Sequence, residues 1–226
     1  MCKNRFANYL AAGICASIFF SSCGTPGPRS APQILRVYAT SAVTPWLPGV
    51  YDCASASIAV ELTRPLASDI QLRLGPPAQW DTPAYQIGSD DVLVVVHPQI
   101  AVGSLTLEQV RELFSGQVTN WKDAGGTDLA VQVWTFSPRE DVQAAIDQVV
   151  LHGQPVSSLA RLAVSAQAMS DGVGVNPGSV GLLPRRWKAG NTREALVVAS
   201  LPVLALVKSV PQGSLRDMIS CLQSAK

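Results

Sequence analysis

The chain has 226 residues, of which 47% are hydrophobic and 15% are charged, with 17 basic residues against 16 acidic ones. A formal net charge of +1, without a cluster of basic residues, argues against nucleic acid as a partner. This length allows one compact domain or two small lobes.

The N-terminus, residues 1–22, has the pattern of a bacterial lipoprotein signal peptide. Two basic residues precede an apolar run, 6–20, that is too short to span a bilayer comfortably. Small residues then lead to Cys23, and residues 23–32 form a tether rich in Gly, Pro and Ser. We expect lipidation at Cys23 and an extracytoplasmic protein that the lipid anchors to the bacterial cell membrane. A plain secretory signal with an incidental cysteine is the alternative.

The rest of the chain alternates predicted strands with predicted helices. Short apolar and β-branched runs predict strands, whereas apolar positions three or four residues apart predict helices. In chain order we expect a strand at 34–39, a helix at 44–56, strands at 58–62, 69–74 and 91–96, a helix at 107–114, a strand at 129–134, a helix at 141–151, strands at 195–198 and 203–210, and a helix at 215–222. Residues 159–168 are ambiguous. This alternation predicts an α/β fold with mostly parallel sheets, which bind ligands at the carboxyl ends of strands.

The most specific stretch of the sequence runs from Ser104 to Trp134. Thr106 can cap a helix that Gly116 can end, and a turn-rich linker around Asn120-Trp121 follows. An ordinary helix–loop–strand unit is the alternative. The sequence of residues 105–126, LTLEQVRELFSGQVTNWKDAGG, resembles the segment LTxEQLRxIFSGxITNWxxxGG of phosphate-type substrate-binding proteins of ABC transporters. Residues 178–184, GSVGLLP, are similar to that family's GSIGYLP.

The resemblance implies the two-lobed periplasmic binding protein type 2 fold, in which each lobe is a mainly parallel sheet flanked by helices. It implies lobe one at 33–97 plus 185–226 and lobe two at 98–184, with a ligand in the cleft between them. The implied function is capture of a small ligand, with an oxyanion such as phosphate as one candidate, for the permease of an ABC importer. We expect a monomer. A sensor or adaptor lipoprotein of the same fold that has lost the phosphate site is the alternative.

Three groups of residues are candidates for ligand binding by this resemblance. A GSTT-like turn of the family corresponds to Thr40 and Ser41, and an ASRP-like strand end corresponds to the region of Arg73. The family's R-E-x-G-S-G-T helix start is replaced by residues 137–141, SPRED. The candidates are Thr40, Ser41, Arg73, Ser137, Arg139 and Asp141. Turn or capping roles for Thr40, Ser41 and Ser137 and a solvent-facing Arg73 are the alternatives.

The carboxylates of Glu140 and Asp141 would repel a phosphate dianion unless Arg139 outweighs them, which argues against phosphate itself.

Catalysis has little support in the sequence. His97 and His152 are far apart, and no nucleophile-elbow, Walker or zinc-protease motif is present. The adjacent carboxylates Asp90-Asp91 and Glu140-Asp141 are poorly spaced to converge on one bond. We therefore expect no enzyme, no cofactor and no metal.

The cysteines predict one disulfide. Of the five, two lie in the signal peptide and Cys23 would carry lipid, which leaves Cys53 and Cys221 in an oxidising compartment. Two separate buried thiols are the alternative.

Overall fold

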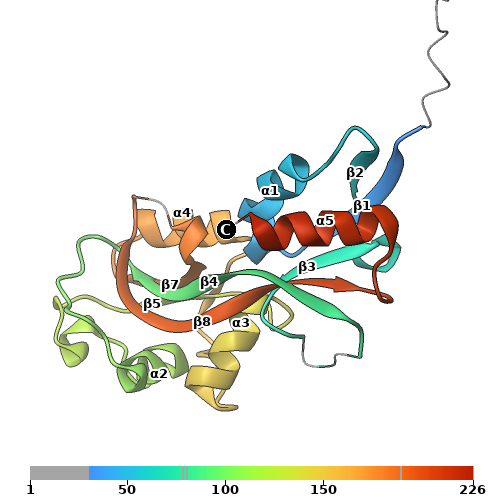
Figure 1. Ribbon diagram of the computed structural model, residues 1–226. Helices are drawn as coiled ribbons and strands as arrows, with labels where there is room; N and C mark the ends of the chain where they lie inside the picture. The colour runs from blue at the N-terminus through green and yellow to red at the C-terminus, as the bar shows by residue number, and fades with distance from the viewer. Residues whose placement is uncertain (1–30, 78, 80, 189, 226) are drawn as a thin grey trace, which may run out of the picture. The chain divides into compact units, whose positions relative to one another are not determined.

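The computed structural model describes residues 31–77, 79, 81–188 and 190–225 (Figure 1). The signal peptide, Cys23 and most of the tether lie outside the described residues, so their predicted roles stay predictions. Residues 32–226 form one unit. Among the described residues, no helix is both long enough and apolar enough to cross a membrane.

Eight strands form one sheet in the order β2-β1-β3-β8-β4-β7-β5-β6. Their bounds are β1 Gln33–Ala39, β2 Ile58–Leu62, β3 Ile70–Leu74, β4 Ala84–Val96, β5 Gln132–Thr135, β6 Arg161–Leu162, β7 Ser179–Pro184 and β8 Arg193–Val207. The pairs β1–β2, β1–β3, β5–β7 and β5–β6 are parallel. The central strands β4 and β8 run antiparallel to each other and to their outer neighbours. The predicted α/β fold is thus confirmed, and parallel pairing is confined to the two sides of the sheet.

The strands β4 and β8 are each continuous where the sequence predicted shorter segments. The first half of β4 pairs with residues 201–206 of β8, and the second half pairs with residues 193–200 and with β7. Register shifts interrupt the ladder at three points, beginning at Gln86/Gly88, and such bulges bend a strand. These two strands therefore connect the β1–β3 side of the sheet to the β5–β7 side.

The helices cover both faces of the sheet. Figure 1 shows α4 and α5 on one face and α2 and α3 on the other. The helices are α1 Leu47–Asp52, α2 Leu107–Ser115, α3 Asp141–Ile146, α4 Ala166–Val175 and α5 Gly213–Ser224. Short helical segments are η1 Ser41–Trp46, η2 Pro65–Ala67, η3 Trp121–Ala124, η4 Asp147–Leu151 and η5 Arg185–Trp187, of which η4 is π-helical and the others are 3₁₀-helical.

The predicted start and end of α2 are confirmed. Thr106 Oγ1 accepts a hydrogen bond from Gln109 N (3.2 Å), and Gln109 Oε1 accepts one from Thr106 N (2.9 Å), which completes a capping box. Gly116 ends the helix with φ at 79°. Leu107 departs from the predicted apolar stripe because it is 43% exposed.

Other local predictions need correction. The predicted helix 44–56 starts earlier, as η1 at Ser41, and its α-helical part ends at Asp52. Helix α4 resolves the ambiguity of 159–168, since β6 ends at Leu162 and the Ser165 hydroxyl caps α4. The sequence did not predict α4 because glycine disfavours a helix. Gly172 is nevertheless suited to its place, since an added Cβ would lie 2.7 Å from the Trp134 ring.

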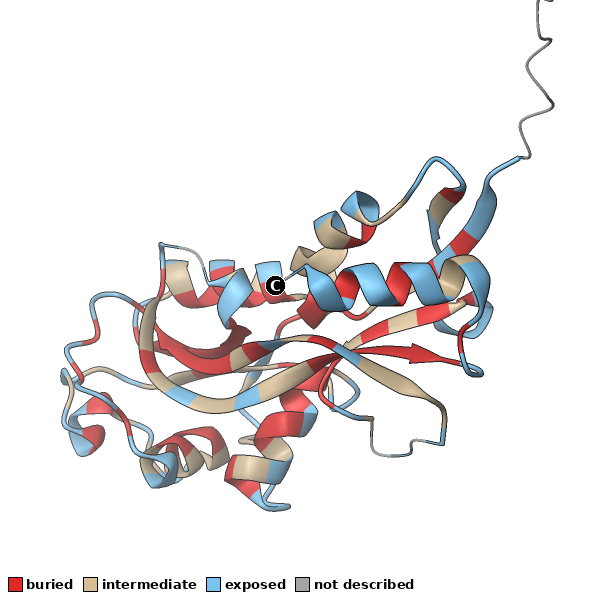
Figure 2. Ribbon diagram, viewed as in Figure 1, coloured by how far each residue is buried: buried red, intermediate tan, exposed pale blue. Residues whose placement is uncertain are grey.

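The core includes the central strands, and Figure 2 shows buried residues on them and on the helices that cover the sheet. Val92 to Val96 of β4 are completely buried. Trp121, which the sequence placed in a turn-rich linker, is also completely buried and donates its Nε1 hydrogen to Gly178 O (2.8 Å). A disulfide joins Cys53, after α1, to Cys221 in α5, with their Cα atoms 5.8 Å apart.

Candidate functional site

The candidate site lies where the carboxyl ends of β1 and β3 meet the start of α3. Because β1 and β3 are parallel, their ends lie at the same edge of the sheet, with Ala39 in register with Leu72. Thr40 follows β1, and Arg73 and Leu74 are the last residues of β3. Asp141 is the first residue of α3 and faces them from the β5 side of the sheet.

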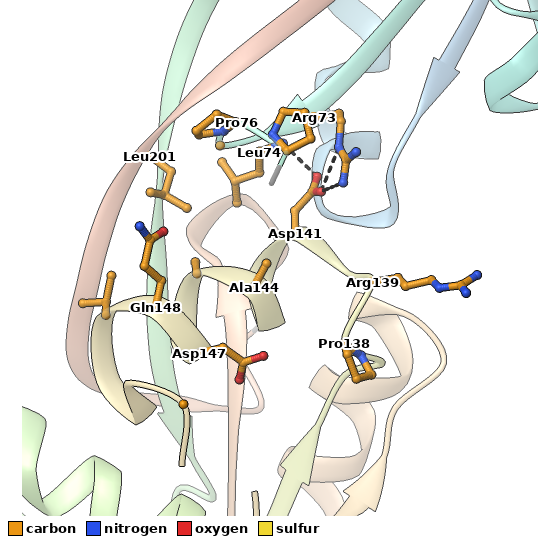
Figure 3. A pocket seen from close by; sticks show the side chains of 15 residues that line it. Arg73, Leu74, Pro76, Pro138, Arg139, Asp141, Ala144, Asp147, Gln148 and Leu201 are labelled. Atoms are coloured by element: carbon orange, nitrogen blue, oxygen red, sulfur yellow. Dashed lines mark hydrogen bonds and ion pairs between the residues drawn. The ribbon is translucent and has the colours of Figure 1, made fainter. Parts of the chain in front are cut away.

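Asp141 is the centre of this site (Figure 3). Its Oδ1 accepts hydrogen bonds from Nε (3.0 Å) and Nη2 (2.6 Å) of Arg73. Its Oδ2 accepts one from Thr40 Oγ1 (2.6 Å) and one from Leu74 N (2.9 Å). The residue is only 5% exposed. A buried carboxylate is stable only when charged and polar donors satisfy it, and four hydrogen bonds do so here.

Glu140 binds the same turn after β1. Its Oε2 accepts a hydrogen bond from Ser41 Oγ (2.8 Å), and Ser41 O accepts one from Trp187 Nε1 (3.0 Å). The phenol of Tyr38, at the end of β1, has a pKa above its ordinary value, chiefly because it is partly buried and because Glu140 is negative. Both carboxylates at the start of α3 thus use the hydroxyls of Thr40 and Ser41.

Ser137 and Arg139 lie apart from this cluster. Ser137 O accepts a hydrogen bond from Glu140 N (2.9 Å), and Glu140 occupies the N-cap position without a side-chain cap. The alternative capping role for Ser137 is therefore wrong. Arg139 is exposed, and Figure 3 shows its side chain directed away from Asp141. Arg73, rather than Arg139, neutralises the carboxylate of Asp141, because the end of β3 brings Arg73 next to it.

A cavity of about 810 Å³ opens beside Asp141. One part of its wall is apolar and includes Leu74, Pro76 and Leu201, while Asp147 and Gln148 add polar groups (Figure 3). Its volume and mixed lining are typical of sites for small organic ligands. The sequence did not indicate Leu201, because this residue lies in β8, remote in the chain from the other lining segments.

A second buried carboxylate lies on β4. Asp90 is 7% exposed, and its Oδ1 accepts a hydrogen bond from Asp91 N (2.9 Å). Within the described part of the chain, its Oδ2 and Trp46 Nε1 are both buried and neither makes a hydrogen bond of full geometry, although the indole N–H is close enough to Asp90 to lower its pKa. Burial raises the pKa of Asp90, and the backbone N–H groups of Asp91 and Arg186 oppose this shift. The Arg186 guanidinium stacks on the Trp46 ring, 4.0 Å from its centroid.

Residues 62–214 match the family model of a PBP superfamily domain. The chain belongs to this family. The resemblance to phosphate-type periplasmic binding proteins is therefore confirmed at the level of family and fold.

Solved structures support the same fold. A protein described as a phosphate ABC transporter substrate-binding protein from Clostridium perfringens, solved with bound phosphate, has a TM-score of 0.75 at 15% identity, covering 84% of this chain and 93% of that one. An ABC-type phosphate transport receptor from Vibrio cholerae has a TM-score of 0.65 at 19% identity, over 84% and 94%. A reduced form of OxyR from N. meningitidis has a TM-score of 0.61 at 11% identity, over 85% and 95%. These likenesses confirm the periplasmic binding protein type 2 fold.

Proposed function

We propose that this protein is a lipid-anchored, extracytoplasmic solute-binding protein that takes a small ligand into the cavity beside Asp141 and delivers it to an ABC importer. The observation that carries this proposal is the cavity itself, at the carboxyl end of β3. We propose the lobe boundaries 33–97 plus 185–226 and 98–184, which assign Leu74 and Pro76 to lobe one and Ala144 and Gln148 to lobe two. All four residues line this cavity (Figure 3). Closure of the lobes over a ligand would then bury it from both sides.

The chemistry of the cavity favours an uncharged or weakly polar organic ligand over a phosphate dianion. Arg73 is already paired with Asp141, so its charge is largely cancelled for an incoming anion. Asp147 adds a further carboxylate to the wall, and the guanidinium of Arg139, which also lines the cavity, is directed away from Asp141 (Figure 3). The apolar side chains of Leu74, Pro76 and Leu201 instead supply surface that an organic ligand could cover.

A thermal-shift panel of sugars, amino acids, small amides and oxyanions tests this proposal. A ligand at 100 times its Kd should add about 2.7 kcal/mol to the free energy of unfolding. Ala144→Phe places a ring in the cavity and should abolish the shift. Gln167→Phe adds the same ring at an exposed position of α4 and should keep it. Equal shifts in both variants would place the ligand elsewhere.

Membrane anchoring has a separate test, which rests on the signal pattern before Cys23. We expect Cys23→Ser to move the protein from the membrane fraction to the soluble extracytoplasmic fraction, because the lipid could no longer be attached. Unchanged membrane retention of the variant would contradict the lipid anchor and leave the cavity proposal untouched.

The hydrogen bonds of Asp141 favour a second candidate function, that of an extracytoplasmic sensor or adaptor. In this protein the Asp141 carboxylate already accepts hydrogen bonds from the hydroxyl of Thr40 and the guanidinium of Arg73. A protein that signals or bridges partners would need no free anion site. The absence of a shift with every class of compound in the panel would favour this function over solute capture.

A further inference from the structure

We propose that Asp141 acts as an intramolecular ligand: its carboxylate fills a site for small oxyanions that Thr40, Arg73 and the Leu74 N–H group form, and so closes that site to free anions. This inference does not depend on whether the cavity takes a solute. It concerns the occupant of the cluster at the strand ends and predicts what happens when that occupant is removed.

The backbone that carries the three donors belongs to the strands and not to α3. Thr40 follows the end of β1, whereas Arg73 and Leu74 lie at the end of β3, so the parallel pairing of these strands fixes the backbone positions of the three donor residues relative to one another. The carboxylate then comes from a third segment, 68 residues after Arg73. Each of its oxygens accepts two hydrogen bonds of 2.6–3.0 Å. A free carboxylate or a larger oxyanion also has two oxygens that could accept these four hydrogen bonds.

The helix does not explain the position of this carboxylate. An acidic residue in the first turn of a helix commonly caps that helix or offsets its dipole. The four hydrogen bonds that the Asp141 carboxylate accepts, in contrast, come from β3 and from the turn after β1. The α-helical part of α3 is also only six residues long. The side chain is therefore placed to bind the strand ends.

Truncation of Asp141 should leave a gap of carboxylate size with its donors still in place. Arg73 and Leu74 line the cavity together with Asp141, so a small anion in solution could reach this gap. Arg73 would be without its ion-pair partner, and an anion would restore both the charge balance and the hydrogen bonds. The ligand class that fits is a small oxyanion, with formate and acetate as the nearest mimics of the missing group and phosphate as a larger one.

The test compares the full-length wild-type protein with Asp141→Ala and with Glu140→Gln. The second variant is a matched control, since it neutralises the neighbouring carboxylate but leaves Asp141 on Arg73. Formate, acetate and phosphate are titrated against chloride at constant ionic strength, and binding is followed by thermal shift and calorimetry. We expect Asp141→Ala to bind acetate or formate at least about tenfold more tightly than the other two proteins, as one charged hydrogen bond would give.

A double variant locates the gained site. Asp141→Ala combined with Arg73→Gln should lose the response to acetate, because it lacks the charged donor. An equal response in the single and double variants, or a folded Asp141→Ala protein with no more response than Glu140→Gln, would overturn the proposal. If Asp141→Ala does not fold alone, its refolding yield decides: a yield that rises with acetate but not with chloride supports the proposal, and a yield that acetate does not raise overturns it.

Discussion

Arg73 and Asp141 form an ion pair in which Nη2 and Oδ1 are 2.6 Å apart, although 68 residues separate them in the sequence. The side chain of Asp141 is 2% exposed and that of Arg73 is 25% exposed. The pair joins the end of β3 to the start of α3, one segment on each side of the central strands. Its loss would leave a carboxylate buried without its charged partner, which is costly.

We expect Arg73→Gln to lower the free energy of unfolding by about 1.5–3 kcal/mol, the range for a hydrogen bond to a charged group. Arg36→Gln is the control, because the pair of Arg36 with Glu61 is exposed on both sides and 3.6 Å long. Such surface pairs contribute about 0–1 kcal/mol. Urea denaturation measures both variants, and equal losses would show that the Arg73–Asp141 pair has no special weight.

Asp90 should make stability depend on pH. Its pKa is raised above the ordinary value of 3.8, mainly by burial, so the folded protein holds this proton more tightly than the unfolded chain. At pH values between 3.8 and the raised pKa, the contribution of Asp90 to the free energy of unfolding therefore falls as pH rises. Asp90→Asn removes the titration, and its stability relative to wild type should be higher at about pH 7 than at about pH 4.

Denaturation of Asp90→Asn and wild type at several pH values measures this difference. The exposed Asp123→Asn controls for the change in net charge. A stability difference between Asp90→Asn and wild type that stays constant across the range would count against a raised pKa in the folded state.

The Cys53–Cys221 disulfide closes a long loop, with a sequence separation of 168 residues. The chain-entropy model gives a stabilisation of about 5 kcal/mol for such a loop as an upper figure. We expect the double variant Cys53→Ala, Cys221→Ala to unfold at clearly lower denaturant concentration. Mass spectrometry of the unfolded, non-reduced wild-type protein checks the bond, and two thiols alkylated without reductant would rule it out.

Gly178 should not tolerate a side chain. Its φ is +80°, and an added Cβ would clash with Ala130 O, while its own carbonyl accepts the hydrogen bond from Trp121. We expect Gly178→Ala to cost more than about 1 kcal/mol of stability, because alanine is strained at positive φ. Gly103→Ala is the control, since nothing lies within 4 Å of the added Cβ and no positive φ is involved. Its effect should be neutral or stabilising by up to about 1 kcal/mol.

The sequence predicted those parts of the fold that local chemistry decides. Helix α2 follows from its capping box and from Gly116, and β1, β2 and β3 follow from short apolar runs between turn residues. The amino-acid sequence of residues 105–126 indicated the periplasmic binding protein family. The sequence also placed Thr40 and Arg73 at strand ends of an α/β fold, which parallel pairing then brings to one edge of the sheet.

The tertiary structure alone decided the features that depend on distant partners. Ser89 and Asp90 lie inside a strand because β8 supplies the ladder for the whole of β4, and Trp121 is buried because η3 lies beside Gly178, the residue before β7. The same holds for the occupant of the site. Its sequence neighbours suggested that Asp141 would repel an anion beside Arg139, whereas the fold sets it on Arg73. A carboxylate takes its role from the donors that packing places around it, and these donors lie far from it in the chain.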